Sequence, residues 1–239
     1  MQDDSSLGAG EIDTSGDTRS RRNAVLRQAT IFRDVEDQDV ALLARIASCH
    51  LYHRGAIVNS SADSEGAIYV VASGSVRVYL LSDAGKEFTL FTCGEGEVFE
   101  LEQIEEEVNG DVVVAAVKDD TVLYAIPWDQ FLEIVAFRPG AVGSLADLLR
   151  EGLLNERRLV KELAFHNMRS RLAHKLAELA ADDPQCIVTK SRDELASLVG
   201  TQSAEVSRAL THFLGEGLIY FRPHGRSVTV LDRERLANY

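Results

Sequence analysis

The sequence predicts an α+β protein in which an antiparallel β domain precedes a long helix and a small helical domain with a C-terminal hairpin. Three features carry this prediction. Short segments rich in Val, Ile, Tyr and Phe alternate with Gly and Asp between residues 57 and 126. Apolar residues at helical spacing follow Pro139-Gly140. Two short helical segments that meet at Gly200 then precede two apolar β segments.

Length and composition indicate a folded chain of two domains. The 239 residues are 45% hydrophobic and 26% charged, as in globular proteins, and a single core rarely exceeds about 250 residues. No apolar run reaches the roughly 18 residues that a membrane helix needs, so we expect no membrane partner. Cys49, Cys93 and Cys186 are odd in number and far apart. Neither a disulfide framework nor CxxC metal spacing is present, and we expect a cytoplasmic protein.

The net charge of −13 is unevenly distributed along the chain. Residues 150–239 contain 14 Lys and Arg against 12 Asp and Glu, whereas residues 1–149 contain 11 against 26. Binding of nucleic-acid phosphates relies on Lys and Arg. The charge pattern therefore permits a nucleic-acid-binding role in the second half and indicates a different role for the acidic first half.

Four segments are expected along the chain. Residues 1–23 are polar and rich in Ser, Gly and Asp, which predicts a disordered tail. Residues 24–140 begin with short helical patterns and continue into the β domain. Residues 141–168 are predicted to form a long helix and a hinge, and residues 169–239 a winged helix-turn-helix domain.

The predicted β segments are short and regularly interrupted, which is typical of an antiparallel barrel or sandwich. Gly and Asp mark the turns between them. The segments are Ile57-Val58, Ala67–Val71, Ser75–Leu81, Phe88–Phe91, Asp111–Val117 and Val122–Ile126.

The long helix carries residues at alternating steps of four and three, which predicts a seam along one side. Either the seam packs on its own domain or, as its length favours, it forms a parallel dimer. Glu156 would lie at or beside the dimer axis, where it either pairs with Arg157 or Arg158 of the second copy or responds to a ligand or a proton. The seam residues are Leu145, Leu149, Gly152, Glu156, Leu159, Leu163 and His166.

The helix-turn-helix prediction rests on signals at the helix ends. Ser191 and Glu194 have the spacing of a capping box, Gly200 can end the first helix, and Thr201 can cap the second. The apolar residues expected to be buried are Leu195, Ala196, Leu198 and Val199 on the first helix, and Val206, Leu210, Phe213 and Leu214 on the second.

The polar residues of the second helix are the candidate DNA contacts. Arg208 can donate two hydrogen bonds to guanine O6 and N7 and is the expected base contact. Arg222 and Arg226 flank or lie in the turn of the following hairpin, where a wing would contact phosphates. An alternative is a small α+β unit with solvated charges. The other candidates are Thr201, Gln202, Ser203, Glu205 and Ser207.

Three motifs, in this order, resemble those of the cyclic-AMP receptor protein/fumarate-nitrate reduction regulator (CRP/FNR) superfamily of bacterial transcription factors. They are the YVVASGSVRVY segment at residues 69–79, the ELAFHNMRSRLA segment at residues 162–173, and DELASLVGT followed by VSRAL within residues 193–210. The resemblance covers about residues 24–231.

The resemblance implies a jelly-roll-like β-roll sensor of cyclic nucleotide-binding type, a dimerisation helix and a winged helix-turn-helix. It also implies a homodimeric, sequence-specific regulator of transcription, not an enzyme. The expected partners are double-stranded DNA with an inverted-repeat operator and RNA polymerase.

Two departures from the family pattern limit what can be transferred. The family's recognition helix usually has a Glu four residues before its Arg and an Arg before that Glu; here these positions hold Ala204 and Ser203. The operator sequence of relatives therefore does not carry over. In the sensor, the phosphate-binding Arg is missing from the acidic segment 96–110, and only Lys86 and Lys118 are cationic between Arg77 and Arg138. Cyclic nucleotide binding is not expected, and the sequence assigns neither an effector nor a cofactor.

Other sensor chemistries stay open. The Glu100–Glu107 segment offers oxygen ligands for a divalent metal, although a solvated acidic loop explains the same residues and is the favoured interpretation. Cys49, His50 and His53 offer haem or metal ligands, or they are packing residues. Glu100, Glu102 and Glu156 are the candidate effector-pocket residues. A member that is active without a ligand is a further alternative.

Several specific chemistries receive no support from the sequence. The family's carbon monoxide sensor has its thiol and imidazole ligands where this chain has Glu100 and Glu102, so its haem ligation does not transfer. An iron-sulfur cluster would need cysteines near the N-terminus. An enzyme or a carrier with a vestigial helix-turn-helix is a remote alternative, because no Ser/His/Asp set, P-loop or nucleotide-binding Gly motif is present. His166 and His174 are interpreted as hinge or surface residues of one helix.

Overall fold

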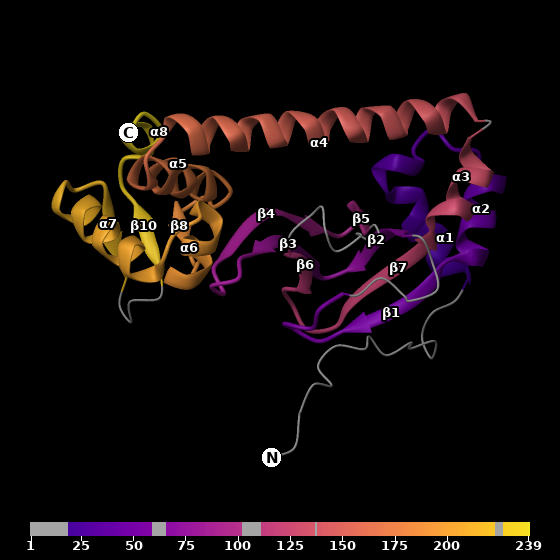
Figure 1. Cartoon of the computed structure of the whole chain (residues 1–239), viewed down its shortest axis with the longest axis horizontal. Coiled ribbons are helices and arrows are strands. Elements are labelled where there is room, and N and C mark those ends of the chain that lie inside the picture. The colour runs from indigo at the N-terminus through magenta and orange to yellow at the C-terminus, as the bar shows by residue number, and fades with distance from the viewer. Residues whose placement is uncertain (1–18, 59–65, 102–110, 137, 223–226) are drawn as a thin grey trace, which may run out of the picture. The chain divides into compact units, whose positions relative to one another are not determined.

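The computed structural model describes residues 19–58, 66–101, 111–136, 138–222 and 227–239. By its internal contacts the chain divides into two units. The first comprises Met1–Tyr79 and Phe91–Leu153, and the second Leu80–Leu90 and Leu154–Tyr239. Figure 1 follows the order of helices and strands from the N-terminus to the C-terminus.

Three short helical elements open the first unit: α1 (Arg19–Gln28), η1 (Thr30–Phe32) and α2 (Asp37–Ile46). Because α1 begins at Arg19, the prediction of a disordered tail is wrong for residues 19–23. Leu26 of α1 is fully buried, and the Arg22 guanidinium donates a 2.5 Å hydrogen bond to the carbonyl of Ala47. These tertiary contacts stabilise a helix that local composition does not indicate.

Seven strands follow in the described residues up to Pro127, and every pair among them whose register is known is antiparallel. They form a four-stranded sheet in the order β1-β7-β2-β5 and a three-stranded sheet in the order β4-β3-β6. The strands are β1 (Ser48–Tyr52), β2 (Ala67–Ser73), β3 (Ser75–Leu81), β4 (Glu87–Gly94), β5 (Val98–Leu101), β6 (Asp111–Ala116) and β7 (Thr121–Pro127).

The strand predictions are largely confirmed, with three differences. Strands β1 and β5 were not expected, and Ile57 makes only an isolated bridge with Ala115 in place of a strand. Gly74, between β2 and β3, has a φ of +84°, and a Cβ there would lie 2.9 Å from the Cα of Thr121. The turn between these strands therefore requires glycine.

The core of the first unit joins the helices to the four-stranded sheet. Phe32 packs edge-on against Phe131 of α3 (Trp128–Val135), with ring centroids 6.1 Å apart. Ile68 and Ile126 lie in the same buried cluster. The buried carboxylate of Asp39 accepts hydrogen bonds from Arg138 at 2.6 and 3.1 Å, which ties α2 to the segment before α4. This ion pair raises the pKa of Arg138.

The helix α4 (Pro139–Phe165) is 27 residues long and unbroken, as Figure 1 shows. Its exposed apolar side differs from the predicted seam. Leu145 packs against the core of the first unit, whereas Leu149, Leu153, Val160 and Leu163 are exposed. In the part of the chain that the structure describes, no helix has both the length and the apolar character required to cross a membrane.

The C-terminal elements form a winged helix-turn-helix with a three-stranded sheet in the order β8-β10-β9. The core contains the fully buried residues Leu172, Val206 and Phe213. The predicted α+β class is confirmed. The elements are α5 (Met168–Ala181), β8 (Ile187–Val188), α6 (Arg192–Val199), α7 (Ser203–Gly215), β9 (Ile219–Phe221), β10 (Val228–Val230) and α8 (Arg233–Ala237).

Candidate DNA interface

Helix α6 begins with the predicted capping box. The Ser191 hydroxyl oxygen accepts a hydrogen bond from the backbone N–H of Glu194 at 3.1 Å, and the Glu194 carboxylate accepts from the backbone N–H of Ser191 at 2.7 Å. Burial opposes the charge of Glu194, but the bonds from Ser191 and the nearby Lys190 lower its pKa overall. Two backbone donors that a helix start leaves unpaired are thereby used.

The corner between α6 and α7 is closed by backbone contacts. Gly200 adopts the left-handed conformation at φ 66° as the C-cap of α6, where a residue with a Cβ is strained. The Arg171 guanidinium of α5 donates to the carbonyl of Val199 at 3.0 and 3.2 Å. The first helix is therefore fixed to α5 at its C-terminal end.

The predicted role of Thr201 as the cap of α7 is wrong. Gln202 is the N-cap and makes no side-chain capping bond. Thr201 is buried, its N–H donates to the carbonyl of Ala196, and its hydroxyl donates to the carboxylate of Glu205. Thr201 thus stabilises the corner from inside the protein.

Helix α7 buries one face in the domain core. Val206, Ala209, Leu210 and Phe213 are almost completely inaccessible. Leu214, expected to be buried, is exposed. Each residue turns an α-helix by about 100°, so Leu214 lies about 80° around the helix axis from Val206, at one edge of the buried face. Ala209 lies at the other edge of that face.

The opposite face of α7 is open to solvent. Ala204, Arg208 and Thr211 are exposed and are spaced four and three residues apart, so they form the centre of the outward face. The Arg208 side chain is 74% exposed, and its guanidinium lies 3.7 Å from the Glu205 carboxylate. An extended arginine at the centre of an open helix face has the reach and the donors to contact a base edge.

The remaining polar side chains of α7 make bonds within the protein. The Ser203 hydroxyl donates to the carboxylate of Asp193. The hydroxyls of Ser207 and Thr211 donate to backbone carbonyls one turn earlier, each at 2.9 Å. Among the predicted contacts on α7 and its N-cap, Gln202 and Arg208 are the exposed ones, and Ser207 is half-buried beside them.

The hairpin that follows α7 has the expected place of a wing. Strands β9 and β10 are antiparallel, with Val228 opposite Phe221. Arg222 is exposed, and its backbone N–H donates to the carbonyl of Ser227 at 3.1 Å. Arg226 lies outside the described residues. Tyr220, exposed on β9, was not among the predicted contacts, although alternation along the strand places it on the side away from the core.

The candidate sensor residues are only partly described. Glu100 lies on β5, opposite Ile68 of β2, whereas Glu102 and the rest of the acidic segment up to residue 110 lie outside the described residues. Glu156 is exposed on α4. The grouping of Glu100, Glu102 and Glu156 in one effector pocket stays a prediction.

The structure does not bring Cys49, His50 and His53 together. Cys49 and His50 are neighbours on β1, where successive side chains point to opposite faces. Cys49 is buried, and the His50 ring lies 2.8 Å from the Ser48 hydroxyl and stacks on Tyr52. Burial lowers the pKa of His50. Within the described ranges, the single cluster of three convergent metal-ligand side chains lies elsewhere.

Known protein families match two parts of the chain. The model of the Crp-like helix-turn-helix domain matches residues 170–239, and that of the cyclic nucleotide-binding domain matches residues 49–136. The first match contains most of α5 and all of α6, α7 and the hairpin. The second contains most of β1 and all of β2 to β7.

Similar proteins span nearly the same length. The Cyclic AMP receptor protein of Thermus thermophilus is 29% identical over 199 residues, covering 83% of this chain and 91% of its own. The CRP-like cAMP-activated global transcriptional regulator of Mycobacterium tuberculosis is 27% identical and covers 89% and 97%. A solved structure of a putative transcriptional regulator of the crp/fnr family from Eubacterium rectale has a TM-score of 0.71 at 21% identity, covering 89% of this chain and 98% of that one.

A winged helix-turn-helix with an open recognition face, following a long helix and an antiparallel β domain, defines a DNA-binding regulator of transcription. The chain belongs to the CRP/FNR superfamily of transcriptional regulators. The members of this family are regulators and not enzymes.

Proposed function

We propose that the protein is a homodimeric, sequence-specific DNA-binding regulator in which each protomer places α7 in a major groove. The observation that carries the proposal is the exposed position of Arg208 at the centre of the outward face of α7. The opposite face of this helix is fixed in the core by Val206 and Phe213, so the arginine is presented on a rigid element. Arg222 and Arg226 of the wing would contact phosphates.

The proposed dimer uses the exposed apolar side of α4. The large apolar residues on this side have the a/d spacing of a coiled coil, with steps of four, seven and three residues. The step of seven spans one further position of the same register. The residues are Leu149, Leu153, Val160 and Leu163. Leu149 and Val160 are 62% and 63% exposed. Four large apolar side chains in one heptad register favour a second copy of the same helix as their cover. Regulators of this superfamily act as dimers.

Glu156 occupies the position on this apolar side between Leu153 and Val160. In a parallel dimer the two Glu156 carboxylates would face each other across the axis, where like charges destabilise the contact. We propose that neutralisation of this pair, by Arg157 or Arg158 of the second copy, by a proton or by an effector, adjusts how the helices meet.

We propose that the β domain does not take a cyclic nucleotide, although its family model and curated relatives carry that name. The Gly94–Glu97 turn already uses three of its backbone donors: the N–H groups of Gly94, Gly96 and Glu97 donate to the Glu97 carboxylate at 2.7 Å, to the carbonyl of Val71 at 2.9 Å and to the carbonyl of Gly94 at 3.1 Å. The Glu95 carboxylate accepts from the Gly74 N–H of the β2–β3 turn at 3.3 Å. Carboxylates in these positions would repel a phosphate. Isothermal titration with cyclic AMP and cyclic GMP should give no binding heat, and saturable binding of either would contradict the proposal.

The proposed compartment is the cytoplasm, where chromosomal DNA and RNA polymerase are present. In the described part of the chain, Cys49, Cys93 and Cys186 form no disulfide, as expected in a reducing environment. Burial, together with the nearby Glu97, raises the pKa of Cys93 to about 12. This thiol is therefore not a reactive thiolate at neutral pH.

Fluorescence anisotropy with labelled duplexes tests the proposed function. The fragment upstream of the protein's own gene should bind more tightly than a random duplex of equal length and charge. Binding to both should weaken steeply with salt, because phosphate contacts release counterions. Equal affinity for both duplexes at every salt concentration would contradict sequence-specific recognition.

A further inference from the structure

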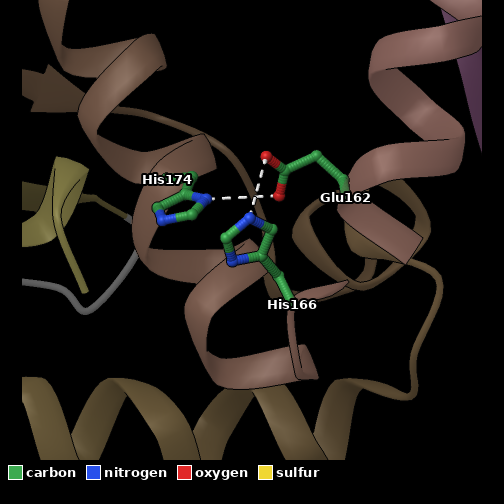
Figure 2. A group of neighbouring side chains, drawn as sticks. All are labelled: Glu162, His166 and His174. Atoms are coloured by element: carbon green, nitrogen blue, oxygen red, sulfur yellow. Dashed lines mark hydrogen bonds and ion pairs between the residues drawn. The ribbon is translucent and has the colours of Figure 1, made fainter. Parts of the chain in front are cut away.

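A cluster of Glu162, His166 and His174 lies at the junction of α4 and α5. Glu162 is in the last turn of α4, His166 is in the link that follows, and His174 is in the middle of α5. Figure 2 shows the three side chains directed toward one another. All three residues belong to the second unit.

The ligand atoms of the cluster converge on one point. His174 Nδ1 lies 3.2 Å from Glu162 Oε2, and His166 Nε2 lies 3.9 Å from Glu162 Oε1. One donor atom from each residue lies within 4.8 Å of the other two. Zinc bonds of about 2.0 Å in tetrahedral geometry place neighbouring ligand atoms about 3.3 Å apart, so small side-chain rotations would bring all three onto one ion.

Hydrogen bonding explains only one of the two contacts that Glu162 makes with the histidines. The bond between His174 and Glu162 satisfies one carboxylate oxygen, but the 3.9 Å separation of His166 Nε2 from the other oxygen is too long for a hydrogen bond. The two imidazole rings stand 4.7 Å apart at an angle of 75°. Among the ion pairs of the described residues, Glu162 meets no Lys or Arg that would neutralise it.

We propose that Glu162, His166 and His174 bind a divalent transition-metal ion of the zinc type. Two neutral imidazoles and one carboxylate form a donor set suited to zinc and to the neighbouring first-row divalent metals. The side chains are 23% to 37% exposed, so the ion can enter from solvent. The open side leaves at least one coordination position for water or an external ligand.

The position of the site gives it a structural consequence. Arg171 of α5 donates to the carbonyl of His166 at 2.9 Å and, with its other nitrogens, to the carbonyl of Val199 at the end of α6. An ion on His166 and His174 would join the end of α4 to α5 close to this arginine. Metal occupancy would therefore make the link between the long helix and the helix-turn-helix more rigid.

Titration of the full-length, chelator-treated protein tests the proposal. Addition of Co²⁺ should produce visible absorption bands that saturate at one ion per chain, and Zn²⁺ should displace them. The variants His166→Ala, His174→Ala and Glu162→Gln should each weaken Zn²⁺ binding at least about tenfold in isothermal titration. Circular dichroism would show whether each variant is folded, and Glu162→Gln preserves the size of the side chain.

The variant His53→Ala is the matched control, because it removes an exposed imidazole that lies outside the cluster. It should bind Co²⁺ and Zn²⁺ like the unchanged protein. Absence of saturable binding by the unchanged protein would overturn the proposal and leave a hydrogen-bonded cluster only. Equal binding by the folded Glu162→Gln variant and the unchanged protein, or an equal loss in His53→Ala, would also overturn it.

Discussion

Replacement of Arg208 by alanine removes the side chain that we expect to contact a base. The guanidinium is 74% exposed and has one ion pair, with Glu205 at 3.7 Å. An exposed pair of this kind contributes only about 0–1 kcal/mol to stability, so the variant should fold. A bidentate arginine–guanine contact contributes about 1–3 kcal/mol. Affinity for the operator should therefore fall about 5- to 140-fold for each half-site, and the homodimer loses this contact in both half-sites.

The measurement is fluorescence anisotropy of the operator and of a random duplex, at several salt concentrations. Arg208→Ala should weaken operator binding while random-duplex binding stays nearly unchanged. The control Arg222→Ala, in the wing, should weaken both duplexes alike and lower the slope of log affinity against log salt by about one per protomer, which is about two for the dimer. An equal loss on both duplexes for Arg208→Ala would refute base recognition and assign this residue to phosphate.

Three further predictions concern the dimer and the stability of each unit. Leu153→Glu should convert the dimer to a monomer in sedimentation experiments, because it places a charge on the apolar side of α4; a variant that stays dimeric would contradict the proposed contact. Gly200→Ala should lower the free energy of unfolding by at least about 1 kcal/mol, measured by denaturant titration, because φ is 66° there. Burial lowers the pKa of His50, so below pH about 6.5 the unfolded chain binds more protons than the folded one. Stability should therefore fall as the pH drops below that value, and His50→Gln should reduce this dependence; an unchanged pH profile would contradict it.

Local signals explain why the helix-turn-helix could be predicted from the sequence. The capping box of Ser191 and Glu194 and the left-handed Gly200 depend on residues close in the chain. Tertiary contacts decided the features that were missed. Strand β1 is defined by its pairing with β7, and α1 is extended toward the N-terminus by the contact between Arg22 and the carbonyl of Ala47.

The apolar side of α4 shows how far helical periodicity can be used. Two sets of residues on this helix have coiled-coil spacing, and both sets contain Leu149, Glu156 and Leu163. The sequence alone favours the one through Leu145, but the first unit covers that residue, and the exposed register runs through Leu153 instead. Periodicity therefore predicts an apolar stripe but not which flank its own domain covers.

Only part of the candidate site was predicted from the sequence, because contacts within the folded domain decide which polar side chains stay exposed. Arg208 is identified by the resemblance and by its helix position. Thr201 and Ser203 are polar in sequence but make bonds inside the domain. The convergence of His166 and His174 was missed because the two residues were assigned to one helix, whereas α4 ends at Phe165 and α5 begins at Met168. The chain direction changes at this junction and brings both rings to Glu162.

The central claim, that two copies of α7 read one duplex, is tested most directly by selection of binding sequences from a random pool of duplexes. The account predicts an inverted repeat with half-sites about one helical turn apart and two chains per duplex by sedimentation. Insertion of about five base pairs between the half-sites should abolish tight binding, because it moves them to opposite faces of the DNA. A single unrepeated site, or one chain bound with the same affinity regardless of spacing, would contradict it.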